Sequence, residues 1–268
     1  MPADHPSREG HFAGRPLVPA VVLIEALAGD YVRHSGQVAR VLRHFRMTGP
    51  LAFGSPMQVA WAPRDGGCWQ VEGRVDKGTG ENVEEGVAGE TACKASFGPG
   101  DGQLAAEPDG VWPDGAASIP LQPAGPLYRA LPYAGAMRLL EALGVGPGGQ
   151  YVVGTGLLQP DHPLAGGEGF PGWAALEYAA QLLACLGVQQ VSGDGAFGNA
   201  APGNSAYGYR LARVRHLLCH RPPFRPKGQV LQVRVDIQAR QPQAVSARFI
   251  ACCEKEPLAS GDFTVVRL

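Results

Sequence analysis

The chain has 268 residues and nearly balanced charge, with 23 Lys and Arg against 24 Asp and Glu. This balance gives no basic field for nucleic acid or an anionic membrane surface, so neither is expected as the main partner. Hydrophobic residues (45%) suffice for one large or two small cores. The six cysteines lack metal-ligand spacing, which predicts reduced thiols and no metal site. The lack of a leader or a membrane-spanning run predicts a cytoplasmic protein.

The first half reads as a helix followed by an antiparallel sheet. Pro19 stands in the first turn of a helix predicted over residues 19–34, where its missing N–H costs nothing. Four strand-like stretches separated by turn residues follow: residues 40–49, 55–64, 68–76 and 89–98. We therefore predict a first domain over residues 1–98.

A linker and a second domain follow. Residues 99–125 have no hydrophobic period and many small residues or prolines, which predicts a linker. The second domain, residues 126–268, begins with a predicted hairpin over residues 137–159 and continues with a helix over residues 171–190. Four strands complete it: residues 207–220, 228–239, 244–254 and 258–268.

The two halves are imperfect copies of one unit. The tripeptide "DHP" occurs at residues 4–6 and 161–163, and a glutamate lies six residues after a proline in both "PAVVLIEALAG" and "PGWAALEYAAQ". The second copy has a loop five residues shorter, without a counterpart of His11. The first copy lacks the opening strands, so either the natural start lies upstream or another part of the chain covers the exposed edge.

Both predicted helices are apolar on nearly every side. Residues 20–28 are interrupted by Glu25, and residues 173–186 by Glu177, Tyr178 and Gln181. A helix without a broad polar face is expected to be wrapped by other structure, such as a curled antiparallel sheet. The alternative is that Glu177 and Gln181, four residues apart on one stripe, simply face water.

The stretch "GHFAGRPLVPAVVLIEALAG" resembles the signature of the hotdog-fold 3-hydroxyacyl acyl-carrier-protein dehydratases, with His11 and Glu25 at the family spacing of fourteen residues. It departs from the family at Ala13, Ala20 and Gly29, where the family has Pro, Gly and Gln. The second half is similar to a dehydratase-like partner in aryl polyene biosynthesis, so the chain resembles a fusion of that pathway's two dehydratase-like proteins. The resemblance implies an α+β double hotdog, each half an antiparallel sheet wrapped around a central helix, with a site shared between the halves.

The unequal copies make one cross-pairing complete. His11 from the first half and Glu177 with Gln181 from the second form a full set, whereas Glu25 faces a loop without a histidine and marks a vestigial second site. His11 suits the role of base, and a buried Glu177, with its pKa raised by desolvation, suits the role of acid. We expect Gln181 to orient Glu177.

Supporting roles follow from the helix starts and the loop. Free N–H groups near Ala20 or Gly172 would stabilise the developing thioester oxyanion, and Gly14 would let the loop approach the acyl chain. His162 matches His5, and both are expected to be structural. A pairing of His162 with Glu25 is the alternative.

Basic residues cluster in an otherwise neutral chain. A carrier-docking role or a merely solvated strand face would each account for them. The candidates for docking are Arg43, Arg46, Arg213, Arg215, Arg221 and Arg225. The expected partner is acyl carrier protein, whose phosphopantetheine carries the substrate, so that no separate cofactor is needed. A dimer of double hotdogs or a heteromer with synthase components is expected.

The predicted function is dehydration of carrier-bound 3-hydroxyacyl thioesters to trans-2-enoyl thioesters, in fatty acid or polyene and polyketide synthesis. Because hotdog folds also host thioesterases, hydrolysis of acyl thioesters is one alternative. A non-catalytic, carrier-binding partner of another dehydratase is the other.

Overall fold

The computed structural model describes residues 3–12, 16–75, 90–100, 119–192 and 209–267. The first half contributes one α-helix and four strands: α1 (Ala20–Ser35), β1 (Val41–Met47), β2 (Met57–Pro63), β3 (Trp69–Val75) and β4 (Glu90–Gly98). The second half contributes one α-helix and seven strands: β5 (Gln122–Pro123), β6 (Ala142–Val145), β7 (Tyr151–Leu158), α2 (Ala175–Ser192), β8 (Tyr209–Cys219), β9 (Gln229–Gln241), β10 (Ala244–Cys253) and β11 (Glu256–Arg267). Both predicted helices and the eight strands predicted after them are present.

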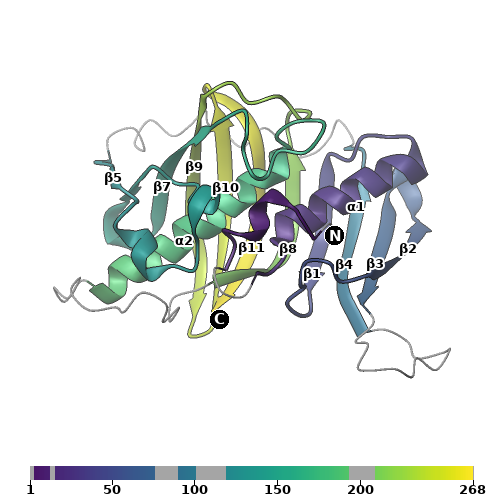
Figure 1. Ribbon diagram of the computed structural model, residues 1–268, viewed down its shortest axis with the longest axis horizontal. Helices are drawn as coiled ribbons and strands as arrows, with labels where there is room; N and C mark the ends of the chain where they lie inside the picture. The colour runs from purple at the N-terminus through teal and green to yellow at the C-terminus, as the bar shows by residue number, and fades with distance from the viewer. Residues whose placement is uncertain (1–2, 13–15, 76–89, 101–118, 193–208, 268) are drawn as a thin grey trace.

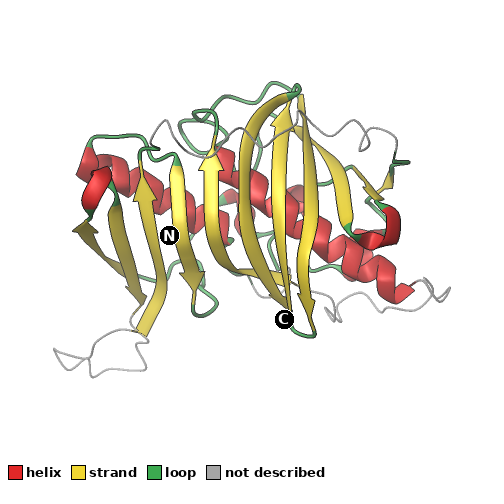
Figure 2. Ribbon diagram, turned by 180° about the vertical axis from the view of Figure 1, so that it is seen from behind, coloured by secondary structure: helices red, strands yellow, loops and turns green. Residues whose placement is uncertain are grey.

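A single antiparallel sheet unites the halves. Among the described residues it has eleven strands in the order β2-β3-β4-β1-β8-β11-β10-β9-β7-β6-β5. The halves meet where β1 pairs with β8, with Val41 opposite Leu218 and Arg46 opposite Arg213. Outward from this pair the order repeats, since β1-β4-β3-β2 corresponds to β8-β11-β10-β9. The sequence repeat is therefore a structural repeat, which Figure 2 shows from the outer face of the sheet.

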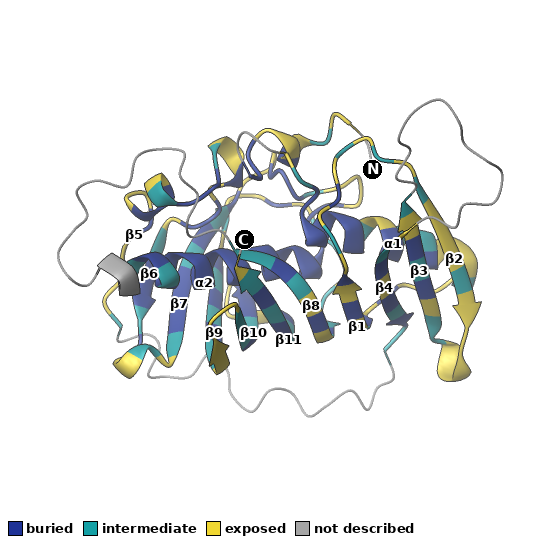
Figure 3. Ribbon diagram, turned by 90° about the horizontal axis from the view of Figure 1, so that it is seen from below, coloured by how far each residue is buried: buried dark blue, intermediate teal, exposed yellow. Residues whose placement is uncertain are grey.

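The two helices lie on the same face of this sheet (Figure 1). Tyr178 and Leu182 of α2 are fully buried, and much of the helix is dark blue in Figure 3. Glu177 and Gln181 are only 4% and 0% exposed, so the alternative that they face water is wrong. An all-round apolar helix is thus wrapped as predicted, with two polar side chains buried inside. Neither helix, over the part of the chain described, has the length and apolarity needed to cross a membrane.

The outer edges of the two halves differ. Strand β9 pairs with β7 on its far side, whereas its counterpart β2 has no further strand among the described residues. In the predicted linker, Gln122 and Pro123 form β5 and pair with β6, and residues 101–118 lie outside the described part. A two-residue strand has too few positions to show alternation, and its proline is tolerated because β5 is an edge.

Candidate active site

A close backbone contact holds the His11 loop against the second half. The amide of Ala134 donates to the carbonyl of Gly10, and His11 forms an isolated bridge with Tyr133. A Cβ atom at Gly10 would lie 2.3 Å from the Ala134 oxygen and 2.8 Å from Cβ of Met137. Glycine is therefore required at position 10, because any side chain would push the two halves apart where His11 is placed.

Substituting Gly10 by alanine is expected to lower the free energy of unfolding by about 1–3 kcal/mol, the usual cost of overpacking. Chemical denaturation would measure it. Gly49→Ala is the matched control, since a Cβ at Gly49 meets no heavy atom within 4 Å. Equal stability of the two variants would show that the residues around Gly10 can move to accommodate a Cβ atom without loss of stability.

His11 is buried and its tautomer is defined. Its Nδ1 lies 2.8 Å from the carbonyl oxygen of Leu17, which can only accept, so Nδ1 carries the proton and Nε2 is left as a base. Burial lowers the pKa of His11 to about 4, against a smaller opposing effect of the bond to Leu17. The imidazole is therefore neutral near pH 7.

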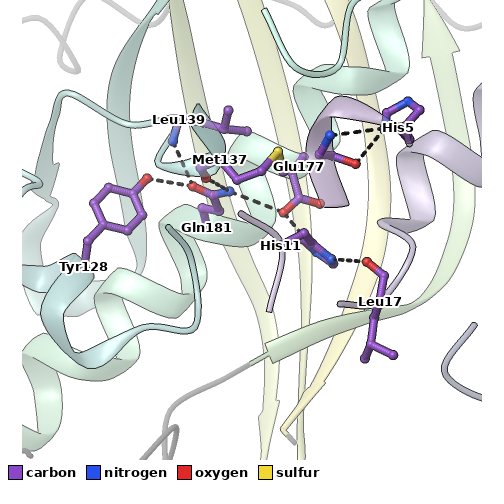
Figure 4. A network of polar contacts seen from close by, with 9 residues as sticks. His5, His11, Leu17, Tyr128, Met137, Leu139, Glu177 and Gln181 are labelled. Carbon is purple, nitrogen blue, oxygen red and sulfur yellow. Dashed lines mark hydrogen bonds and ion pairs between the residues drawn. The ribbon is translucent and has the colours of Figure 1, made fainter. Parts of the chain in front are cut away.

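Glu177 meets His11 from the other half. It lies in the first turn of α2, and its Oε1 is 3.7 Å from His11 Nε2 (Figure 4). This separation is too long for a direct hydrogen bond, but a single oxygen atom can lie within bonding distance of both groups. Burial raises the pKa of Glu177 to about 7, opposed by a hydrogen bond from Gln181. The structure thus brings together a neutral base and an acid that is partly protonated near pH 7.

A buried network fixes the orientation of Gln181. Leu140 N–H donates to the Tyr128 hydroxyl (2.8 Å), so that hydroxyl donates its proton to Gln181 Oε1 (2.6 Å). The amide nitrogen must then be the end that donates to Met137 O (2.9 Å) and Glu177 Oε1 (3.4 Å). Figure 4 shows this network running from Tyr128 through Gln181 to Glu177.

The same network corrects a predicted strand boundary. The hairpin was expected to begin at residue 137, but β6 begins at Ala142. The amides of Leu139 and Leu140 are taken by the side chains of Gln181 (3.3 Å) and Tyr128 (2.8 Å). These amides therefore do not join the sheet ladder.

A cavity of about 420 Å³, its open mouth included, adjoins the His11 and Glu177 pair. Ala20, at the start of α1, is part of its wall, and the first N–H groups of a helix have no partner within the helix. Gly172 lies elsewhere, because its Cα packs against Cys219 of β8 so closely that a Cβ would be 2.8 Å from Sγ. Of the two predicted sources of N–H donors, only Ala20 lines this cavity. Gly14 lies outside the described residues.

Glu25 lies in a second cavity of about 530 Å³ at the equivalent place in the other half. The indole N–H of Trp173 donates to Glu25 Oε2, and burial raises the pKa of the Glu25 carboxyl. The expectation that no histidine accompanies Glu25 is incomplete, because His5 lines this cavity. However, His5 Nδ1 is engaged by Ser7 (2.8 Å to Oγ), and among the described residues His5 forms no hydrogen bond or ion pair with Glu25.

His162 is engaged away from Glu25. Its Nδ1 accepts from the amide of Leu164 (3.1 Å), so Nε2 carries the proton and donates to the Tyr178 hydroxyl (2.8 Å). Both ring nitrogens are therefore used to hold the loop, and the alternative pairing of His162 with Glu25 is not formed.

The predicted docking arginines fall into two groups. Arg46 and Arg213 line a groove of about 900 Å³ together with His44, Arg64 and Lys94. Arg43 and Arg215 lie on the same two strands, β1 and β8. Arg221 and Arg225 lie beyond the far end of β8, in the loop where Phe224 bridges Phe170, and Arg221 pairs with Glu256 at 3.3 Å. This second group is beside the loop that lines the Glu25 cavity.

Arg46 is placed in an unfavourable register. It lies directly opposite Lys94 of β4 on one side and Arg213 of β8 on the other. Like charges at opposed positions destabilise a sheet. Lys94 pairs with Glu72 (3.1 Å), but Arg46 and Arg213 form no ion pair with any described residue. The outer face of the central strands therefore carries uncompensated positive charge.

Three residues at the site were not predicted. Tyr128 orders Gln181 from 53 positions away, Tyr133 lines the cavity beside His11, and Arg210 lines it from β8. Only Arg210 has a sequence signal, because it belongs to the cluster of basic residues within positions 210–227. No cluster of three or more metal-ligating side chains occurs in the part of the chain that is described.

No protein-family model and no curated protein matches the chain. Solved structures do match, at sequence identities of 12% and 14% for two of them, and similarity at this level defines the fold alone. The fold is an α+β double hotdog, as predicted. The dehydratase domain of RzxB from Pseudomonas fluorescens superimposes with a TM-score of 0.71 at 12% identity, covering 99% of this chain and 91% of that one.

Two further solved structures agree in fold. The dehydratase domain of a mycocerosic acid synthase-like polyketide synthase has a TM-score of 0.71 at 14% identity, covering 99% of this chain and 88% of that domain. An N-terminal dehydratase from the difficidin assembly line has a TM-score of 0.67 at 14% identity, covering 99% and 90%. The chain is thus similar over its whole length to domains described as dehydratases.

Proposed function

We propose that the protein dehydrates 3-hydroxyacyl thioesters carried on acyl carrier protein to trans-2-enoyl thioesters. The observation that carries this proposal is the 3.7 Å approach of His11 Nε2 and Glu177 Oε1 in a cavity, one neutral and basic, the other with a pKa raised to about 7. Elimination of water needs such an acid and base together. The fold shared with dehydratase domains supports the same reaction.

In the proposed reaction, His11 and Glu177 supply and accept every proton that moves, so no further cofactor is needed. His11 Nε2 removes a proton from the carbon beside the thioester carbonyl, while the carboxyl proton of Glu177 passes to the 3-hydroxyl, which leaves as water. Negative charge that develops on the thioester oxygen is stabilised by the free N–H groups at the start of α1, near Ala20. The proton now on His11 returns to Glu177 across the short gap between them.

Mass spectrometry of a 3-hydroxyacyl carrier protein incubated with the protein tests the proposal. Loss of the mass of one water from the acyl group is the expected result. Release of free acid would instead indicate a hotdog thioesterase, and binding without either change would indicate a non-catalytic partner of another dehydratase.

We further propose that the carrier docks on the outer face of β1 and β8. The uncompensated charge of Arg46 and Arg213, with Arg43 and Arg215 on the same strands, supports an acidic partner there. Arg221 and Arg225 lie beside the Glu25 cavity and are therefore not part of this docking surface.

Replacing Arg46 by serine is expected to raise KM for a carrier-bound substrate by up to about fivefold, since an exposed charge contributes about 0.2–1 kcal/mol. The increase should shrink at high salt. Steady-state kinetics at two ionic strengths would measure it, with Arg225→Ser as the matched control. A larger effect of Arg225→Ser would move the docking surface to the other side.

We also propose a biosynthetic pathway and an oligomeric assembly for the protein. Fatty acid synthesis and polyene or polyketide synthesis both use carrier-bound 3-hydroxyacyl chains, and the neighbour described as a domain of a polyketide synthase supports the second. The edge of β2, which pairs with no further strand among the described residues, supports a dimer of double hotdogs or a heteromer with synthase components.

A further inference from the structure

Arg210 brings a positive charge to the wall of the His11 cavity. It is the second residue of β8 and lies opposite Val266 of β11. Its side chain is only partly buried, but its Nη1 is fully enclosed and has no hydrogen-bond partner. Among the described residues, every other buried side-chain nitrogen or oxygen atom has a hydrogen-bond partner.

Arg210 and Arg213 line different cavities although both lie in β8. Arg213 lines the outer basic groove with Arg46 and Lys94. Arg210, near the start of the strand, lines the His11 cavity together with its neighbours Tyr209 and Leu211. Between the two arginines the register of β8 with β11 shifts, which interrupts the regular alternation of side chains.

Nothing in the described part of the chain neutralises Arg210. Glu177 lines the same cavity, but its contacts are with His11 and Gln181, and no described carboxylate pairs with Arg210. Much of the remaining wall is apolar, including Phe12, Leu17 and Leu51. A guanidinium donor buried without an acceptor is costly and calls for a ligand that supplies one.

We propose that Arg210 binds an oxyanion of the thioester substrate, either a carboxylate on the acyl chain or the phosphate of the pantetheine arm. This inference rests on the proposed function, because it takes the cavity to be the thioester site. A guanidinium fork matches the paired oxygens of carboxylate and phosphate, and partial burial strengthens the contact. Arg210 thereby selects substrates by charge, beside the reacting pair.

Calorimetric binding of three thioesters without a 3-hydroxyl group tests this apart from catalysis. The probes are butyryl-pantetheine, which is neutral, butyryl-4′-phosphopantetheine, which adds the phosphate, and glutaryl-pantetheine, which adds a carboxylate. One anionic probe is expected to bind roughly tenfold more tightly than the neutral one, as a charge-assisted contact provides. Which probe gains identifies the source of the oxyanion.

Arg210→Met is expected to bring that affinity ratio close to one. Arg33→Met is the control, since Arg33 is an exposed residue at the end of α1 with 71% of its side chain accessible. An unchanged ratio in Arg210→Met, or no preference for either anion in the unchanged protein, would overturn the inference. Charge selection without dehydration of the 3-hydroxyacyl substrate would uphold Arg210 and reject the proposed reaction instead.

Discussion

A His11→Ala variant is expected to lose dehydration roughly 100- to 10,000-fold in kcat/KM, the range in which a positioned general base contributes. The loss follows from the fixed tautomer. With Nδ1 donating to Leu17, Nε2 is the basic atom facing the cavity, and among the described residues no other histidine lines it. Initial rates of enoyl thioester formation, followed by mass spectrometry, would measure the effect.

His5→Ala is the matched control for this variant, because His5 is the histidine of the second cavity. Its rate is expected to stay close to that of the unchanged protein. Thermal unfolding of both variants should accompany the rates, since His11 is buried and its removal leaves the Leu17 carbonyl without a partner. An active His11→Ala protein beside an inactive His5→Ala protein would move the working site to the Glu25 cavity.

The pairing of the two halves explains why one cavity is complete and the other is not. The repeat places Glu25 and Glu177 at equivalent positions on α1 and α2, and both are substantially buried. His11 then meets Glu177 across the junction, whereas Glu25 meets the indole of Trp173. A double hotdog in one chain allows this asymmetry, because each copy of the repeat carries its own substitutions.

Local and periodic features of the chain were predictable from its sequence. The apolar surround of Glu177 and Gln181 predicted a wrapped helix, and the structure buries both side chains. The equal offset of Glu25 and Glu177 from a proline predicted the repeat, which the strand order confirms. The cross-pairing of His11 with Glu177 rested on family resemblance, and the two side chains do lie together.

Features that depend on distant contacts escaped prediction. The bond from Tyr128 to Gln181 joins residues 53 positions apart, and nothing in the local pattern marks it. Gly172 starts a helical turn as expected, but packing against Cys219 removes it from the His11 cavity. The register shift between Leu211 and Arg213 depends on pairing with the distant strand β11, and the sequence of β8 alone does not reveal it.

The activity of the unchanged protein is expected to follow a bell-shaped dependence on pH. His11 must be neutral to act as a base, and its pKa lowered to about 4 makes kcat/KM rise as the pH passes upward through that value. Glu177 must hold a proton to act as an acid, and its pKa raised to about 7 makes kcat/KM fall as the pH passes that value. Among the described residues, His11, Tyr133 and Tyr128 interact with this carboxyl, and Arg210 lines the same cavity.

Replacing Glu177 by glutamine is expected to lower kcat/KM roughly 100- to 10,000-fold, because the amide keeps the shape of the carboxyl but cannot release a proton to the departing hydroxyl. Glu25→Gln makes the same change at the equivalent position of the other half and is expected to retain activity, since Glu25 faces Trp173 and not His11. Rates for both variants across the pH range would separate the two carboxyls. An inactive Glu25→Gln protein beside an active Glu177→Gln protein would reverse the pairing, and a descending limb near pH 7 that persists in Glu177→Gln would assign that proton to another group.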